Sequence, residues 1–457
     1  MTAEVFVRRT RIQAPIGEAF RWHARPGALE RLTAPWEPVE MVERTGGIED
    51  GARVVLRMKM GPLSRRWVAE HRDYREGRGF RDVQIEGPFP RWEHTHTFEP
   101  DGDDACYLED RIEYKLPLGV LGRLVGGPMV RKRLNRLFSY RHQVMQQDIA
   151  AHTQREVRPM RIVTSGSTGL IGSALIPFLT TGGHEVARLV RSQPREGGSE
   201  FRWDPDAGQI DPAAFAGVDA VVHLAGENIS GRWTEVKKAR ILESRVAGTR
   251  TVAEALAGLS EPPKVLVSSS AVGYYGDRGD EVLTEESSSG SLFLSEVCRQ
   301  WEAATEPAVA KGIRVVNLRT APVLSPAGGP LAQLLTPFRL GLGGVVGSGR
   351  QYFPWIAIDD LIGAIHHALV TESLSGPLNA AAPHQVTNRE FTKTLGRVLG
   401  RPTLFPLPAF AARLAFGEVA DELLLASQRM EPVRLRASGY GFRFPELEGA
   451  LRHLLGK

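Results

Sequence analysis

The segment of this chain that best combines residue type and spacing for chemistry is residues 160–172, Met-Arg-Ile-Val-Thr-Ser-Gly-Ser-Thr-Gly-Leu-Ile-Gly. A β-rich run precedes its three evenly spaced glycines, and a helix-like run follows them. This order leaves unpaired backbone N–H groups at the positive end of the helix, where a pyrophosphate can bind. The alternative is a glycine-rich turn without a ligand. We predict a cofactor-binding turn made by Gly166, Ser167, Thr168, Gly169, Leu170, Ile171 and Gly172.

The residues after the second predicted strand indicate which nucleotide binds. An NAD site usually has Asp or Glu at this position, which accepts a hydrogen bond from the ribose 2′-hydroxyl. This chain instead has Arg191 and Ser192 after the strand Glu185–Val190. The planar guanidinium of an arginine makes bidentate hydrogen bonds to a phosphate. We therefore predict NADP(H) as the cofactor, although a solvated surface arginine would give the same pattern.

Small and polar residues follow the next predicted strands. The run 220–224 leads into Ala225 and Gly226, which leave room for a dinucleotide across the strand ends. Glu227 comes next, where a nicotinamide could reach it, although a solvated or capping carboxylate is the simpler interpretation. The further predicted cofactor contacts are Leu224, Ala225, Gly226 and Ser268.

The elements that position these residues alternate between strands and helices from Met160 onward. Strands are expected at 161–164, 185–190, 220–224, 265–268 and 314–318, and long helices at 234–256 and 292–310. This alternation predicts an α/β domain over residues 160–457, a Rossmann-type doubly wound parallel sheet. The alternation stops near Pro322, so residues 320–350 and 376–457 are expected to form a small mixed region on the substrate side.

The preceding residues have a different order of predicted strands and helices. Residues 1–151 begin with a strand and a short helix, continue with five strand-like runs separated by Gly, Pro and Asp turns, and end in a long helical stretch from about 129 to 151. This order predicts an α+β domain. A polar connector, residues 152–159, separates it from the α/β domain.

Composition limits the remaining functions. The chain has 457 residues, 42% of them hydrophobic and 24% charged, and a net charge of +4, which is typical of a globular protein with more than one domain. The small charge gives little support to nucleic-acid binding, and no run of about 18 apolar residues predicts a membrane span. Cys106 and Cys298 predict no disulfide framework and favour a reducing, cytoplasmic location.

Several motifs together carry a resemblance to a known family. They are GSTGLIG, HLAGENI, RWTEVKKARILESRVAGT, SSSAVGYYGDRGDE, GLGGVVGSGRQYFPWIAIDD and NREFTKTLGRVLGRP. Residues 160–457 resemble the extended short-chain dehydrogenase/reductases, and more closely the atypical branch called epimerase family proteins. The resemblance implies that Ser270 stands at the position of the catalytic serine, that the glycine turn holds the cofactor and that the substrate is a small molecule.

The resemblance fails at one pair of residues. The family's acid/base is a Tyr followed four residues later by a Lys, which lowers the pKa of the phenol. The corresponding helix, residues 291–302, contains neither residue type. Any proton would have to come from Tyr275, Glu227 or bound water, while Cys298 has the surroundings of a buried, inert thiol. Tyr275 also fits a structural or substrate-contact role.

Residues 3–150 resemble the START-like, polyketide-cyclase type of ligand-binding fold, through the opening motif VFVRRTRIQAPIGEAFRWHARPGALERLTAPW, the strands that follow and the closing helix. The resemblance implies a helix-grip fold, in which a curved sheet surrounds a long helix, and a lipophilic ligand. His94 and His96 share one strand face, but no third ligand with suitable spacing is evident, so no metal is predicted. The basic residues of the closing helix are interpreted as a solvated face.

Two functions remain open. The first is an NADP(H)-dependent oxidoreductase or epimerase-like enzyme, in which Ser270 polarises a substrate oxygen. The second is a non-catalytic NADP(H)-binding sensor, whose START-like domain engages a lipid or a partner. The missing Tyr and Lys favour the sensor, whereas the glycine turn fits both.

Overall fold

The computed structural model describes residues 3–60, 63–117, 119–153, 158–195 and 197–457. The chain divides into two compact units, unit 1 mainly from residues 1–158 and unit 2 mainly from residues 159–455. The predicted connector 152–159 starts in the last turn of helix α3 (Gly119–Thr153), and its residues 154–157 lie outside the described part. The domain limits 1–151 and 160–457 therefore stay a prediction.

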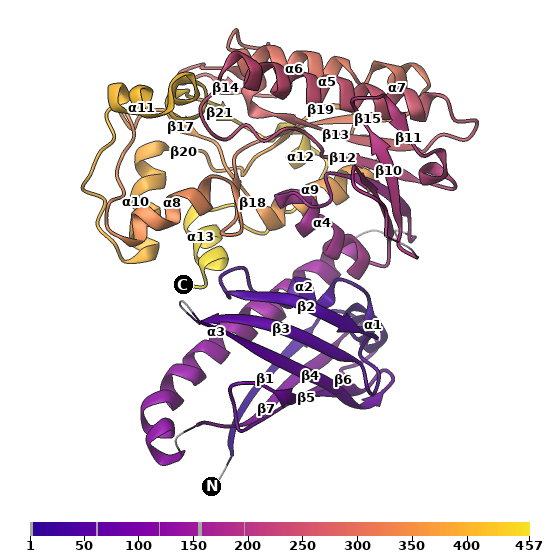
Figure 1. The fold of residues 1–457 in the computed structure, drawn as a ribbon, viewed down its shortest axis with the longest axis vertical. Coiled ribbons are helices and arrows are strands. Elements are labelled where there is room, and N and C mark those ends of the chain that lie inside the picture. The colour runs from indigo at the N-terminus through magenta and orange to yellow at the C-terminus, as the bar shows by residue number, and fades with distance from the viewer. Residues whose placement is uncertain (1–2, 61–62, 118, 154–157, 196) are drawn as a thin grey trace. The chain divides into compact units, whose positions relative to one another are not determined.

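Unit 1 is an antiparallel seven-stranded sheet, in the order β1-β7-β6-β5-β4-β3-β2, with the long helix α3 against it (Figure 1). Alternate residues of the strands are buried, as in β7, where Leu108 and Ile112 lie in the core. Met145 and Ile149 of α3 belong to the same core as Phe98 and Leu108. The α+β prediction is therefore confirmed. The elements are β1 (Glu4–Ile12), α1 (Ile16–Ala24), α2 (Ala28–Leu32), β2 (Val39–Thr45), β3 (Arg53–Met60), β4 (Leu63–Arg75), β5 (Gly79–Glu86), β6 (Arg91–Pro100), β7 (Cys106–Lys115) and α3.

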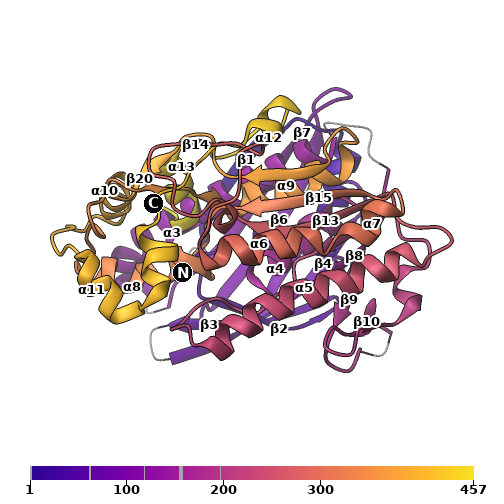
Figure 2. The ribbon, with the colours of Figure 1, turned by 90° about the horizontal axis from the view of Figure 1, so that it is seen from above.

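Unit 2 is built on an eight-stranded sheet in the order β11-β10-β9-β8-β12-β13-β15-β19, parallel except for the β10–β11 pair. Figures 1 and 2 show helices α5, α6 and α7 on one face of the sheet and α4 and α9 on the other. This is the predicted doubly wound sheet. Its strands are β8 (Arg161–Ser165), β9 (Glu185–Val190), β10 (Glu200–Asp204), β11 (Gln209–Ile210), β12 (Ala220–His223), β13 (Val265–Ala271), β15 (Arg314–Thr320) and β19 (Gly376–Ala380).

The helices of this sheet are α4 (Leu170–Thr181), α5 (Glu235–Ala257), α6 (Phe293–Ala303), α7 (Glu306–Ala310) and α9 (Ile358–Val370). The helical stretch predicted over residues 292–310 consists of two helices, α6 and α7, with a break between them. Pro307 stands in the first turn of α7. A proline donates no backbone hydrogen bond, so it fits best in the first turn of a helix, where that N–H would have no partner within the helix.

The mixed region beyond β15 contains short strands and helices, as predicted. Among the described residues of the chain, we find no helix with the length and apolar character that crossing a membrane requires. The remaining elements of unit 2 are η1 (Pro212–Phe215), η2 (Val272–Tyr275), β14 (Val282–Leu283), β16 (Val323–Leu324), α8 (Gly329–Arg339), β17 (Tyr352–Phe353), β18 (Ile356–Ala357), β20 (Val386–Thr387), α10 (Asn388–Leu399), α11 (Ala409–Phe416), η3 (Ala420–Leu425), β21 (Arg429–Met430), α12 (Val433–Ala437) and α13 (Leu447–Leu455).

Candidate cofactor site and ligand cavity

The three glycines of the turn between β8 and α4 have different surroundings. A Cβ on Gly166, which has a φ of 69°, would lie 2.8 Å from the carbonyl carbon of Leu224, and one on Gly172 would lie 2.3 Å from the carbonyl oxygen of Gly166. Close backbone approach therefore requires both glycines. Gly169 is exposed, and only the Gly166 oxygen, at 3.3 Å, would be near its Cβ. The backbone of Gly169 is therefore accessible at the helix start, where a phosphate would bind.

The turn lies where the order of the strands in the sheet reverses. Strand β8 lies between β9 and β12. The chain adds β9, β10 and β11 on one side of β8, and then returns to add β12, β13, β15 and β19 on the other side. Dinucleotides bind at such a switch point in doubly wound folds. The Ser165 hydroxyl lies 2.8 Å from Nδ1 of His223 and accepts hydrogen bonds from the backbone N–H groups of Leu224 and Ala225. Burial lowers the pKa of His223 to about 4, so its ring is neutral.

The other predicted cofactor contacts differ in accessibility. Arg191 and Ser192 are exposed just after β9. Ser268, in contrast, is completely buried inside β13. We therefore leave Ser268 out of the residues proposed to contact the cofactor.

Glu227 belongs to an ion pair. Its Oε1 accepts a hydrogen bond of 2.6 Å from Lys237 Nζ. This hydrogen bond is the main cause of the lowered pKa of the Glu227 carboxyl. Glu227 is therefore ionised at neutral pH and holds no proton to donate to a substrate.

Ser270 lies in a buried network that the sequence did not indicate. Its Oγ donates a hydrogen bond of 2.7 Å to Oε1 of Glu302 in α6. The same carboxylate accepts two hydrogen bonds from Arg319 of β15, at 2.8 and 2.9 Å. Burial opposes the charged form of Arg319, but the hydrogen bonds and charge of Glu302 raise its pKa. The hydroxyl proton of Ser270 is therefore held in a hydrogen bond to Glu302.

Tyr275 is packed into the same network. Its ring is fully buried, and its hydroxyl donates toward the backbone oxygen of Thr284 and Oδ1 of Asn379, while accepting from Arg319. Burial raises the pKa of Tyr275 to about 12. These contacts favour the structural interpretation of Tyr275 over proton donation to a substrate.

Helix α6 presents two non-titrating side chains to the end of β13. Leu294 packs so closely against Gly273 that a Cβ added to this glycine would lie 2.8 Å from the Cβ of Leu294. Cys298 donates a hydrogen bond from Sγ to the backbone oxygen of Ala271 at 3.6 Å. The two residues are four positions apart, the spacing of the family's Tyr and Lys. Burial raises the pKa of the Cys298 thiol to about 12. Neither side chain exchanges a proton near neutral pH.

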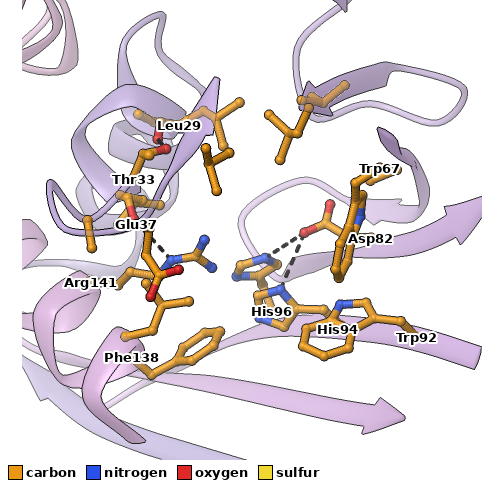
Figure 3. Close-up of a pocket in the computed structure, with 18 of the residues that line it drawn as sticks. Leu29, Thr33, Glu37, Trp67, Asp82, Trp92, His94, His96, Phe138 and Arg141 are labelled. Atoms are coloured by element: carbon orange, nitrogen blue, oxygen red, sulfur yellow. Dashed lines mark hydrogen bonds and ion pairs between the residues drawn. The ribbon is translucent and has the colours of Figure 1, made fainter. Parts of the chain in front are cut away.

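Unit 1 encloses a cavity of ≈ 280 Å³ between the sheet and the helices. Most of its lining is apolar, including Leu29, Trp67, Trp92 and Phe138, but the wall shown in Figure 3 also carries histidines, an aspartate and Arg141. Arg141 donates from Nε to the backbone oxygen of Leu32. Apolar walls with a few polar groups are typical of small-molecule sites.

Comparison with known protein families gives three matches. The family described as "NAD dependent epimerase/dehydratase family" matches residues 162–380, and "Polyketide cyclase / dehydrase and lipid transport" matches residues 12–138. A domain of unknown function, DUF1731, matches residues 407–454. The first two matches fall in unit 2 and unit 1, respectively.

Individual relatives agree with these matches. The epimerase family protein Mb2239 of Mycobacterium bovis is 44% identical over 291 residues, which are 64% of this chain and 96% of that protein. A crystal structure described as the nucleoside-diphosphate sugar epimerase from Corynebacterium glutamicum is 35% identical, with a TM-score of 0.82, covering 99% of this chain and 90% of its own.

A third relative covers unit 2. The crystal structure of human epimerase family protein SDR39U1 with NADPH is 38% identical, with a TM-score of 0.59, over 65% of this chain and 99% of its own. The chain therefore belongs to the NAD dependent epimerase/dehydratase family, as an epimerase family protein whose first unit has the polyketide-cyclase type of fold.

Proposed function

We propose that unit 2 binds NADP(H) and acts as an atypical reductase or epimerase-like enzyme on a small molecule, and that unit 1 holds a lipophilic ligand. The exposed backbone at Gly169, beside Gly166 and Gly172, where close backbone contacts leave no room for a side chain, is the observation that carries the cofactor proposal. When bound, the nicotinamide would supply or accept a hydride. The related human protein crystallised with NADPH supports this nucleotide.

The residues proposed to hold the cofactor come from three strand ends. The turn from Gly166 to Gly172 would bind the pyrophosphate, and Leu224, Ala225 and Gly226 would lie along the dinucleotide. Arg191 and Ser192 would bind the 2′-phosphate, since both are exposed after β9. Ser270 stays the proposed contact to a substrate oxygen, and this requires its hydroxyl to turn away from Glu302.

Arg191→Ala is expected to weaken NADPH binding about 10-fold or more, because a hydrogen bond to a charged group is worth about 1.5–3 kcal/mol. NADH has no 2′-phosphate, so its affinity is expected to stay within about 2-fold of the wild type. Titration calorimetry of the full chain measures both. Arg250→Ala, which removes an exposed arginine from α5, is the control for net charge. An equal loss for both nucleotides would assign Arg191 a role other than 2′-phosphate recognition.

The second candidate function, a non-catalytic NADP(H) sensor, is favoured by Leu294 and Cys298 of α6 and by the engaged hydroxyls of Ser270 and Tyr275. Two assays separate the two functions: NADPH oxidation over a panel of carbonyl compounds, and product analysis of nucleoside-diphosphate sugars incubated with the protein and NADP⁺. The second assay is needed because epimerisation returns the hydride and leaves no net change in the cofactor. These sugars are the first substrates to test, because the Corynebacterium relative is described as an epimerase of such sugars. Turnover supports the enzyme, and tight NADPH binding without turnover of the panel supports the sensor. A cytoplasmic location stays part of this proposal.

A further inference from the structure

One wall of the cavity in unit 1 carries a row of imidazole and carboxylate groups. His71, Asp82 and His94 are register neighbours across strands β4, β5 and β6, and His96 follows two residues after His94 on the same strand face. All four line the cavity. Their side chains are between 5% and 22% exposed, and Asp82 is the most exposed of them. The row is therefore buried in the domain and accessible only in part.

The three imidazoles converge on one carboxylate. Asp82 Oδ2 lies 3.4 Å from His94 Nδ1 and 3.2 Å from His96 Nε2, and Asp82 Oδ1 lies 2.8 Å from His71 Nε2. Figure 3 shows Asp82, His94 and His96 facing one another at the cavity. One ligand atom from each of these three residues lies within 4.8 Å of the others.

A second carboxylate holds the far side of two of the rings. Asp110 Oδ1 lies 2.8 Å from His94 Nε2 and 2.7 Å from His96 Nδ1, and the Asp110 side chain is only 4% exposed. A histidine that binds a metal nearly always donates its other ring N–H to a carboxylate, carbonyl or water, which fixes the tautomer. With the Nε2 proton of His94 directed to Asp110, this ring turns its Nδ1 lone pair toward Asp82, and His96 Nε2 lies within hydrogen-bond distance of the same carboxylate. A lone pair facing a carboxylate requires a cation between them, either a second ring proton or a metal ion.

We propose that Asp82, His94 and His96, with His71 beside them, form a binding site for a divalent first-row transition metal ion in the wall of the cavity. The separations of 3.2 and 3.4 Å between donor atoms agree with the roughly 3.4 Å expected between two ligands of a tetrahedral metal at about 2.1 Å. Imidazoles with one carboxylate suit Zn²⁺ or Fe²⁺ better than Mg²⁺ or Ca²⁺. Because the site faces the cavity, an open coordination position would point toward the cavity ligand. The proposal does not rest on NADP(H) binding in unit 2.

The test uses the full chain after removal of metals with a chelator. Titration with Zn²⁺ and with Co²⁺ is expected to show one tight site per chain, with visible Co²⁺ absorption bands of a histidine-coordinated ion. Asp82→Asn, which preserves shape, and His96→Asn, which removes the imidazole, are each expected to weaken binding about 10-fold or more, and Asp110→Asn to weaken it about 10–100-fold. His384→Asn, which replaces a histidine whose side chain is 57% exposed in unit 2, is the control for surface binding. Circular dichroism and thermal unfolding monitor the folding of every variant.

The wild type alone also decides the question, in case the variants fail to fold. X-ray absorption of the Zn²⁺-loaded protein is expected to show nitrogen and oxygen ligands at about 2.0–2.1 Å with the outer-shell scattering of imidazole. Absence of a stoichiometric site, absence of imidazole scattering, or affinities in folded Asp82→Asn and His96→Asn within 2-fold of the wild type would overturn the proposal. The row would then be an ion-pair network of protonated histidines.

Discussion

Glu302→Ala is expected to lower the free energy of unfolding of unit 2 by about 3 kcal/mol, the lower end of the cost of breaking a buried ion pair. The variant leaves the Arg319 guanidinium, whose side chain is 4% exposed, without the carboxylate that accepts two of its hydrogen bonds. Ser270 also loses the acceptor of its hydroxyl. Thermal and urea unfolding of the full chain, monitored by a signal from unit 2, measure the effect.

The same helix supplies the matched control. Glu296 pairs with Arg299 on the exposed side of α6, where both side chains are more than 40% exposed. Exposed pairs contribute about 0–1 kcal/mol, so Glu296→Ala is expected to change stability by less than 1 kcal/mol. If both substitutions cost the same small amount, the Ser270–Glu302–Arg319 network does not stabilise unit 2 as the geometry indicates.

Gly169→Ala is expected to weaken NADPH binding about 10–100-fold, which corresponds to about 1.4–2.7 kcal/mol, with little change in stability. The added methyl group would lie on the exposed side of the turn beside the start of α4, where the Gly166 oxygen, 3.3 Å away, would have to shift only slightly. Gly169 does not have a positive φ, so alanine causes no backbone strain there. Titration calorimetry and thermal unfolding separate binding from folding.

Two further glycines make this prediction specific. Gly172→Ala is expected to reduce stability as well as binding, because its Cβ would lie 2.3 Å from the Gly166 oxygen. Gly449→Ala, in helix α13 with no atom within 4 Å of its Cβ, is expected to leave NADPH binding unchanged. If Gly169→Ala binds NADPH as tightly as the wild type, the phosphate does not lie against this turn.

The sheet of unit 2 was predictable because its strands are short, apolar and separated by helices, and β8, β9, β12, β13 and β15 fall where the sequence places them. Strand β2 of unit 1 was missed because most of its residues are exposed and no alternating apolar face marks it. Strand β10 was also missed, although Phe201 and Trp203 alternate with polar residues in it and pack into the core. Pattern reasoning detects continuous apolar runs and overlooks an exposed strand such as β2 or a short alternating one such as β10.

The same limit applies to the candidate sites: a local motif could be predicted, and contacts between residues distant in the sequence could not. The glycine turn is a local motif, so spacing alone indicated it. The partners of Ser270 could not be predicted, because Glu302 lies 32 residues away and Arg319 comes from the neighbouring strand. The absence of a third ligand for His94 and His96 was inferred from sequence spacing, whereas the antiparallel register places Asp82 directly opposite His94. Strand register, which the sequence does not specify at this point, brings these residues together.

Titration calorimetry of the full-length wild type with NADPH and with NADH under the same conditions shows whether unit 2 recognises the 2′-phosphate. We expect one NADPH site per chain and an affinity for NADPH at least about 10-fold higher than for NADH, because Arg191 would pair with the 2′-phosphate. Equal affinities for the two nucleotides, or no binding of either, would overturn the proposal that unit 2 is an NADP(H) site.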